Sequence, residues 1–206
     1  MTAVAAVRQV PTPHGPARLT EHPLPDPAAI LLLGHGAGGG VGAPDLLAAT
    51  AAATATGVGV VLVELPYRVA GRRAPAPAAQ LDAAWLAVVA DVRAACPGVP
   101  LLFGGRSSGA RVACRTAGAG GASGVLCLAF PVHPPGRPEK HRLAELAAPT
   151  VPVLVVQGER DPFGCPEPAP GREVVVLRGD HSLRSDRAGL TAAVTDWLAR
   201  VPTRSI

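Results

Sequence analysis

A serine between two glycines, directly after a short apolar run, constrains the fold of this chain most. Residues 105–109 are Gly-Arg-Ser-Ser-Gly, and the run before them, residues 99–103, is Val-Pro-Leu-Leu-Phe. Residues 110–115 continue with a helix-compatible pattern, so the motif G-x-S-x-G lies where a strand turns into a helix. Such a sharp turn needs strained backbone angles and close packing, which flanking glycines allow. The pattern predicts a strand and a helix that expose one serine between them.

Only Ser107 fits this motif in both directions. Gly105 and Gly109 stand at the required offsets from Ser107, whereas Ser108 would have arginine and alanine there. A serine hydroxyl is a weak nucleophile unless it is held beside a general base and hydrogen-bond donors. Ser107 is therefore the candidate nucleophile, and an ordinary glycine-rich turn is the structural alternative.

Apolar stretches alternate with helix-compatible stretches along the chain. Expected strands are 4–10, 17–20, 30–33, 58–63, 101–103, 125–129, 153–156 and 174–177, and expected helices are 44–56, 78–95 and 188–201. Apolar strands without polar alternation predict a sheet that is covered on both faces. Strand–helix alternation predicts parallel pairing through crossover helices. The expected fold class is α/β, with a mostly parallel sheet of about eight strands flanked by helices.

Length and charge limit the class of protein. A chain of 206 residues has the size of one domain, and we expect residues 1–206 to form a single one. The net charge is +4, but the arginines are scattered and aromatic residues are scarce, so nucleic acid is not an expected partner. No apolar run is long enough to span a membrane.

Cysteine usage and the N-terminal sequence bear on the compartment. The four cysteines show neither a C-x-x-C pair nor zinc-ligand spacing, and the N-terminus lacks the pattern of a signal peptide. We therefore expect a reduced, cytoplasmic protein without a metal. The sequence leaves the oligomeric state open.

The loop after the expected strand 30–33 is rich in glycine. Residues 34–39 are Gly-His-Gly-Ala-Gly-Gly, and H-G-x-G loops supply one backbone N–H of an oxyanion hole. We expect this donor at Ala37, with Gly38 as the neighbouring alternative and Gly36 beside the substrate. The N–H of Ser108, which follows the nucleophile, would be the second donor.

The same loop also fits a dinucleotide-binding fingerprint. Gly34-x-Gly36-x-x-Gly39 follows a strand, and Glu64 ends the next strand, where an acid could bind a ribose. A dinucleotide-binding domain has no use for a serine turn further along the chain, so this alternative is the less favoured one. We expect no cofactor.

The loop after the expected strand 153–156 contains the candidate acid. Asp161 lies a few residues past the strand end, and Pro162 stiffens the loop behind it. Glu159 is the local rival, but it lies closer to the strand. The structural alternative for Asp161 is a turn aspartate that binds its own backbone.

The loop after the expected strand 174–177 contains the candidate base. His181 lies downstream of both Ser107 and Asp161, and Ser-Asp-His is the chain order of one family of catalytic triads. Asp180 cannot readily orient the ring of its own neighbour. A lone loop histidine is otherwise usually a surface residue, so the position after the last strand carries this prediction.

Six stretches together resemble a known superfamily. They are residues 32–39, 66–73, 104–111, 130–140, 157–164 and 179–183, spread over nearly the whole chain. They resemble the α/β-hydrolase superfamily in its small dienelactone-hydrolase-like branch, and most closely a group of short predicted hydrolases. The resemblance implies a hydrolase with an α/β-hydrolase fold but implies no substrate. Residues 108–110, Ser-Gly-Ala, depart from the common Met-Gly-Gly.

Two further loops follow strand ends on the expected catalytic face. One contains Tyr67, Arg68, Arg72 and Arg73, and the other contains His133. These residues are candidates for substrate binding, and an arginine there would favour acidic substrates such as carboxylated esters or lactones. The structural alternatives are an ion-paired loop for the arginines and a local hydrogen bond for His133.

The predicted function is that of a serine hydrolase acting on a small-molecule acyl substrate. Ser107 would attack the carbonyl of an ester, thioester or lactone, His181 would transfer the proton, and Asp161 would orient the imidazole. The segment between strands 125–129 and 153–156 is too short for a lid domain, so we expect an open active site. A catalytically silent interaction module with the same fold is the alternative.

Overall fold

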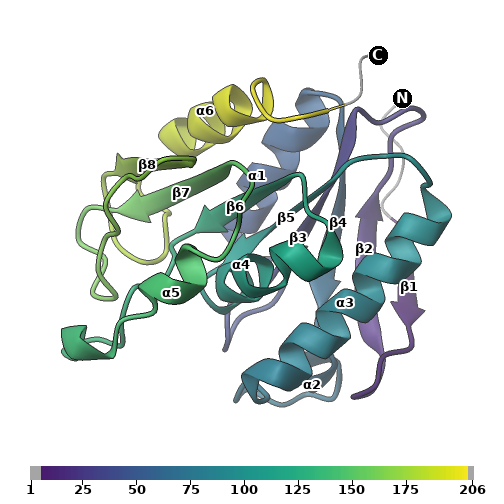
Figure 1. The fold of residues 1–206 in the computed structure, drawn as a ribbon, viewed down its shortest axis with the longest axis horizontal. Helices are drawn as coiled ribbons and strands as arrows, with labels where there is room; N and C mark the ends of the chain where they lie inside the picture. The colour runs from purple at the N-terminus through teal and green to yellow at the C-terminus, as the bar shows by residue number, and fades with distance from the viewer. Residues whose placement is uncertain (1–5, 204–206) are drawn as a thin grey trace.

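One sheet of eight strands forms the centre of the molecule, in the order β1-β2-β4-β3-β5-β6-β7-β8 (Figure 1). The computed structural model describes residues 6–203, so the part of the first expected strand at residues 4 and 5 lies outside the described residues. The strands are β1 (Ala6–Val10), β2 (Ala17–His22), β3 (Ala29–Gly34), β4 (Val58–Glu64), β5 (Leu101–Arg106), β6 (Gly124–Leu128), β7 (Val153–Gly158) and β8 (Arg172–Leu177). From β4 to β8 every neighbouring pair is parallel, and only β1 and β2 run antiparallel to their neighbours. The predicted fold class is confirmed.

Helices cover both faces of this sheet. They are α1 (Pro44–Ala55), α2 (Pro66–Val69), α3 (Ala78–Ala95), α4 (Ser108–Gly120), α5 (Leu143–Leu146) and α6 (Arg187–Leu198), with a 3-10 turn η1 (Pro138–Lys140). The helices α3 and α4 pack on one face, and α1 and α6 pack on the other (Figure 1). No helix between residues 6 and 203 has the length and apolar character needed to cross a membrane.

The strand side chains alternate between two hydrophobic layers. Leu32 and Phe103 face α3 and α4, whereas Leu31 and Leu102 face α1 and α6. Trp85 of α3 meets Phe103 edge-on, with ring centroids 5.8 Å apart. Apolar residues that are buried on both faces explain why these strands lack polar alternation.

Several strands extend further than the sequence indicated, among them β5 and β7. The sequence indicated an end at residue 103 for β5 and at 156 for β7, but β5 continues to Arg106 and β7 to Gly158. Gly104 still pairs in the ladder, and a Cβ there would lie 2.7 Å from the carbonyl oxygen of Leu126. Glycine is a poor strand former by itself, so close packing in the sheet sets these ends. The short elements α2, η1 and α5 were not expected from the sequence.

The segment between β6 and β7 carries only η1 and α5, so no lid domain is inserted there. Arg111 of α4 holds α5 by two bonds to the Glu145 carboxylate, at 2.8 and 2.6 Å. Arg115 adds a third at 3.0 Å. Burial opposes ionisation of Glu145, but the bonds from Arg111 and Arg115 keep the pKa of Glu145 below its usual value. This short insertion is therefore fastened to the helix that follows Ser107.

Candidate active site

The turn between β5 and α4 places Ser107 in a strained backbone conformation. Its φ is 52° and its ψ is −107°, outside the regions that L-residues favour. Such a conformation costs about 1–3 kcal/mol and persists only where the surroundings enforce it. The Ser107 N–H donates to the carbonyl oxygen of Leu128 on β6 at 2.9 Å, which ties the turn to the neighbouring strand.

The glycines of the motif allow α4 to approach the loop after β3. A Cβ at Gly105 would lie 2.5 Å from the carbonyl oxygen of Gly34, and one at Gly109 would meet the same oxygen still more closely. Any side chain at either position would displace the helix from the sheet. The spacing that singled out Ser107 in the sequence thus has a direct steric cause.

The structure brings Ser107, His181 and Asp161 together in hydrogen-bonding order. Nε2 of His181 lies 3.0 Å from Oγ of Ser107, and Nδ1 of His181 lies 2.7 Å from Oδ2 of Asp161. The Asp161 side chain is 0 % exposed and that of His181 is 17 % exposed. The serine follows β5, the aspartate follows β7 and the histidine follows β8, so all three lie at the carboxyl ends of parallel strands.

Two further donors hold the Asp161 carboxylate. Nε2 of Gln157 donates to Oδ2 at 2.7 Å, and the Phe163 N–H donates to Oδ1 at 2.9 Å. The same Gln157 nitrogen lies 2.7 Å from the Gly164 oxygen and 3.2 Å from the Phe130 oxygen. Three surrounding acceptors settle which end of this amide is nitrogen. Gln157 is not among the residues predicted from the sequence, although a polar residue at the end of an apolar strand is a usable signal.

The rival carboxylates have other contacts. Glu159 is exposed and pairs with Arg160 at 2.9 Å. Asp180 accepts bonds from the hydroxyl and the N–H of Ser182, and these bonds lower the pKa of the Asp180 carboxyl. Neither side chain is bonded to the His181 ring.

His133 lies against the loop that carries the acid. Its N–H donates to the Phe163 oxygen at 3.0 Å, and a Cβ at Gly164 would lie 2.7 Å from its Nε2. The Phe163 ring in turn packs on the His181 ring, with centroids 4.3 Å apart. His133 therefore supports the segment that holds both the acid and the ring of the base.

The loop after β3 approaches the turn at Ser107 through Gly36. Within residues 6–203, the N–H groups of Ala37 and Ser108 have no protein acceptor. Gly36 faces the turn at Ser107, because a Cβ at Gly36 would lie 3.7 Å from Cβ of Ser107. A Cβ at Gly38 would meet no atom within 4 Å, so this position faces open space.

Two hydrogen bonds of the buried His35 ring stabilise the loop after β3. The Leu65 N–H donates to Nε2 of His35 at 3.1 Å, so Nδ1 carries the proton and donates to the Gly36 oxygen at 2.8 Å. Burial lowers the pKa of His35, which keeps the ring neutral and preserves both bonds.

Tyr67 and the arginine loop lie beside the same segment. The Tyr67 hydroxyl donates to the Ala37 oxygen at 2.9 Å, and burial raises the pKa of Tyr67 to about 12, so the hydroxyl stays protonated. Nη1 of Arg68 donates to the Arg72 oxygen at 3.0 Å, and the side chains of Arg72 and Arg73 are exposed. The structure thus gives Tyr67 and Arg68 contacts within the loops themselves.

The glycines of the dinucleotide-like pattern are used for packing. A Cβ at Gly34 would lie 3.3 Å from Cα of Gly109, and one at Gly36 would lie 2.9 Å from Nη1 of Arg106. Glu64 pairs with Arg18 at 2.9 Å. No group of three or more His, Cys, Asp or Glu residues within the described part of the chain could hold a metal ion.

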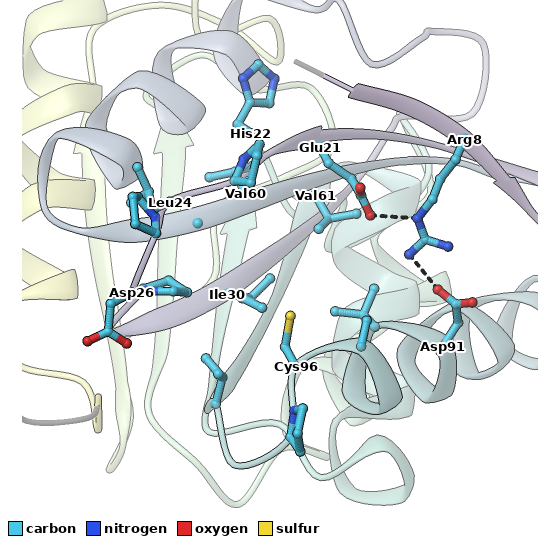
Figure 2. Close-up of a pocket in the computed structure, with 18 residues that line it drawn as sticks. Arg8, Glu21, His22, Leu24, Asp26, Ile30, Val60, Val61, Asp91 and Cys96 are labelled. Atoms are coloured by element: carbon cyan, nitrogen blue, oxygen red, sulfur yellow. Dashed lines mark hydrogen bonds and ion pairs between the residues drawn. The ribbon is translucent and has the colours of Figure 1, made fainter. Parts of the chain in front are cut away.

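Two pockets lie at opposite ends of the sheet. A pocket of about 520 Å³ lies near the amino ends of β3 and β4, where Arg8 bridges Glu21 and Asp91 (Figure 2). It contains none of the predicted site residues. A second pocket, of about 380 Å³, adjoins the candidate site and is lined by the glycine-rich loop, the start of α1, Arg106, Ser182 and Arg184.

A mostly parallel sheet with a serine after β5, an acid after β7 and a histidine after β8 defines the α/β-hydrolase class. A family model described as an alpha/beta hydrolase domain matches residues 27–194. The chain therefore belongs to the alpha/beta hydrolase family, which confirms the resemblance seen in the sequence.

Solved structures share this fold over nearly the whole chain. An α/β serine hydrolase without a lid from Xanthomonas campestris is 21 % identical, with a TM-score of 0.79. The match covers 100 % of this chain and 99 % of the Xanthomonas chain. A serine hydrolase homologue from Coxiella burnetii is 18 % identical, with a TM-score of 0.77 and coverages of 96 % and 98 %. A dienelactone hydrolase from Anabaena variabilis is 14 % identical, with a TM-score of 0.73 and coverages of 97 % and 98 %. Among curated proteins, none matches the sequence.

Proposed function

We propose that this protein is a serine hydrolase that cleaves a small ester, thioester or lactone through an acyl-enzyme. The observation that carries the proposal is the hydrogen-bonded chain from Ser107 through His181 to the buried carboxylate of Asp161. A serine with a base within hydrogen-bond reach, and an acid that orients the base, is the arrangement that activates a hydroxyl nucleophile.

Each side chain then has a defined step. Asp161 accepts a hydrogen bond from the Nδ1–H of His181, which leaves Nε2 free to take the proton of Ser107 as Oγ attacks the acyl carbon. The N–H groups of Ala37 and Ser108 stabilise the negative charge that develops on the carbonyl oxygen. His181 then protonates the leaving group, and water cleaves the acyl-enzyme by the same route in reverse.

The structural neighbours support this class of reaction. Besides those above, they include an esterase from Pyrococcus furiosus and a thioesterase domain from the curacin biosynthetic pathway. Their identities of 14 % and 15 % show a shared fold only, so the proposal rests on the side chains of this chain's own site.

An active-site probe tests the proposal directly. A fluorophosphonate should modify the wild-type protein once, and peptide mass spectrometry should place the adduct on Ser107. An interaction module with an inert site would stay unlabelled, which would contradict the proposal. A dinucleotide-binding protein would instead be stabilised against heat by added NAD.

We expect a preference for short acyl chains, from acetyl to butyryl. No lid domain is inserted between β6 and β7, and no apolar side chain larger than that of Pro44 lines the adjoining pocket. Each buried methylene would add about 0.8 kcal/mol of binding free energy, so only an enclosed apolar pocket rewards longer chains steeply. The measurement is kcat/KM on a series of p-nitrophenyl esters, and an optimum at ten or more carbons would refute this expectation.

Tyr67→Phe should lower kcat about threefold to tenfold with little change in KM, because a neutral hydrogen bond contributes about 1 kcal/mol. The lost bond holds the carbonyl of Ala37, and the N–H that we assign to the oxyanion hole lies on the same loop. Thr12→Val is the matched control, since it removes a hydroxyl-to-carbonyl bond, here to Gly15, in an exposed turn. Equal losses in both variants would show that Tyr67 serves stability alone.

A further inference from the structure

Arg106, the residue before Ser107, extends its guanidinium between three other segments of the site. Nη2 donates to the carbonyl oxygen of His181 at 3.0 Å, and Nε lies 2.7 Å from Oδ2 of Asp45 at the start of α1. Nη1 lies beside the loop after β3, because a Cβ at Gly36 would be 2.9 Å from it. The Arg106 side chain therefore contacts the loop that carries His181, the loop after β3 and the first turn of α1.

The partner of this guanidinium is a deeply buried carboxylate. The Asp45 side chain is 1 % exposed, and its Oδ1 accepts the Leu46 N–H at 2.9 Å. A buried charge is costly unless an opposite charge and hydrogen bonds compensate it. Asp45 is bonded to none of the three residues Ser107, His181 and Asp161, so its effect on the site must pass through Arg106.

The bond from Arg106 reaches the backbone of the base itself. His181 lies on the loop between β8 and α6, while Arg106 ends β5, the strand that leads into Ser107. Both side-chain bonds of the His181 ring depend on where this peptide lies. The guanidinium therefore couples the peptide of His181 to the strand of Ser107 without touching the imidazole nitrogens.

We propose that Arg106 is a positioning residue for His181, and that Asp45 holds the guanidinium in the orientation this requires. The proposal rests on the hydrolase function proposed above. A planar guanidinium can bond a carboxylate and a carbonyl at once, whereas an ammonium is a point charge with a different geometry. A displacement of a reacting group by about 1 Å can cost about 10²-fold in rate.

The test compares Arg106→Ala, Arg106→Lys and Asp45→Asn with Arg8→Ala. Arg8 is the matched control, because it also pairs with an aspartate, Asp91, but at the opposite end of the sheet (Figure 2). We expect kcat on a short p-nitrophenyl ester to fall about 10²-fold in Arg106→Ala, with KM within about twofold. Arg106→Lys should recover little, and Asp45→Asn should show a smaller loss of the same kind. Arg8→Ala should keep the wild-type kcat.

Two readouts separate positioning from folding. Millimolar guanidinium ion should restore part of kcat to Arg106→Ala and leave Arg8→Ala unchanged. The downfield proton resonance of the Nδ1–H of His181 should shift or broaden in Arg106→Ala and Asp45→Asn, and this NMR signal needs no turnover. If wild type neither hydrolyses esters nor reacts with the fluorophosphonate, the proposed function fails, and the resonance alone decides the role of Arg106.

Three results would overturn the proposal. One is an unchanged kcat together with an unchanged His181 resonance in Arg106→Ala. Another is a rise in KM at constant kcat, which would make Arg106 a substrate ligand. The third is an equal loss of kcat in Arg8→Ala, which would make the effect one of general stability.

Discussion

Ser107→Ala should lower kcat for ester hydrolysis about 10⁶-fold, the loss seen when the nucleophile of a serine triad is removed. The side chain of Ser107 is the hydroxyl bonded to Nε2 of His181, so no other group can take its place in the attack. The fold should persist, because Ala keeps the Cβ of Ser107 and removes only the hydroxyl, so no atom is added to the strained turn. The measurements are steady-state rates and the thermal midpoint of the same preparation.

Ser108→Ala is the matched control for this variant. The proposed role of Ser108 resides in its backbone N–H, which alanine retains, so kcat should stay within a few-fold of wild type. Fluorophosphonate labelling should vanish in Ser107→Ala and persist in Ser108→Ala. Substantial residual turnover in Ser107→Ala, or an adduct on Ser108, would show that the nucleophile is misassigned.

Asp161→Asn should lower kcat about 10⁴-fold, because the imidazole would adopt the wrong tautomer. Oδ2 of Asp161 accepts from both His181 and Gln157, while Oδ1 accepts from the Phe163 N–H. An asparagine places its NH₂ group against one of these sets of donors in either orientation. If the NH₂ group faces Nδ1, the imidazole proton moves to Nε2, which can then no longer accept the serine proton.

Glu159→Gln is the control for the acid. Glu159 lies on the same loop, is exposed and pairs only with Arg160 among the described residues, so its neutral variant should retain nearly full activity. The two variants are compared by kcat/KM on the same ester, with circular dichroism to verify folding. Similar losses in both would mean that the acid is not Asp161.

Local patterns were sufficient to predict the fold class and the chain order of the three candidate residues Ser107, Asp161 and His181. Hydrophobic runs predicted the buried strands, because a parallel sheet covered on both faces selects apolar residues at consecutive positions. The spacing of Gly105 and Gly109 singled out Ser107, because the turn leaves no room for a side chain at either glycine. Asp161 and His181 were predicted from strand ends and chain order, since parallel strands bring their carboxyl ends to one edge of the sheet.

The strand ends and the supporting contacts depended on the tertiary structure. β5 continues through two glycines to Arg106 because neighbouring backbones pair with it, a context that overrides the weak strand propensity of glycine. The short helix α5 is held by Arg111 through Glu145, and no periodic pattern in four residues could have indicated it.

By itself, the sequence determined the α/β fold class, the single register of the serine motif and the chain order of the candidate triad, because each depends on local spacing. Only the tertiary structure decided that Gln157 binds Asp161, that Tyr67 binds the loop after β3 and that Arg106 joins Asp45 to the carbonyl of His181. These contacts join side chains to groups on other loops or strands, and their geometry is set by how the sheet and helices pack. A hydrogen bond between such groups leaves no periodicity in the chain that contains them.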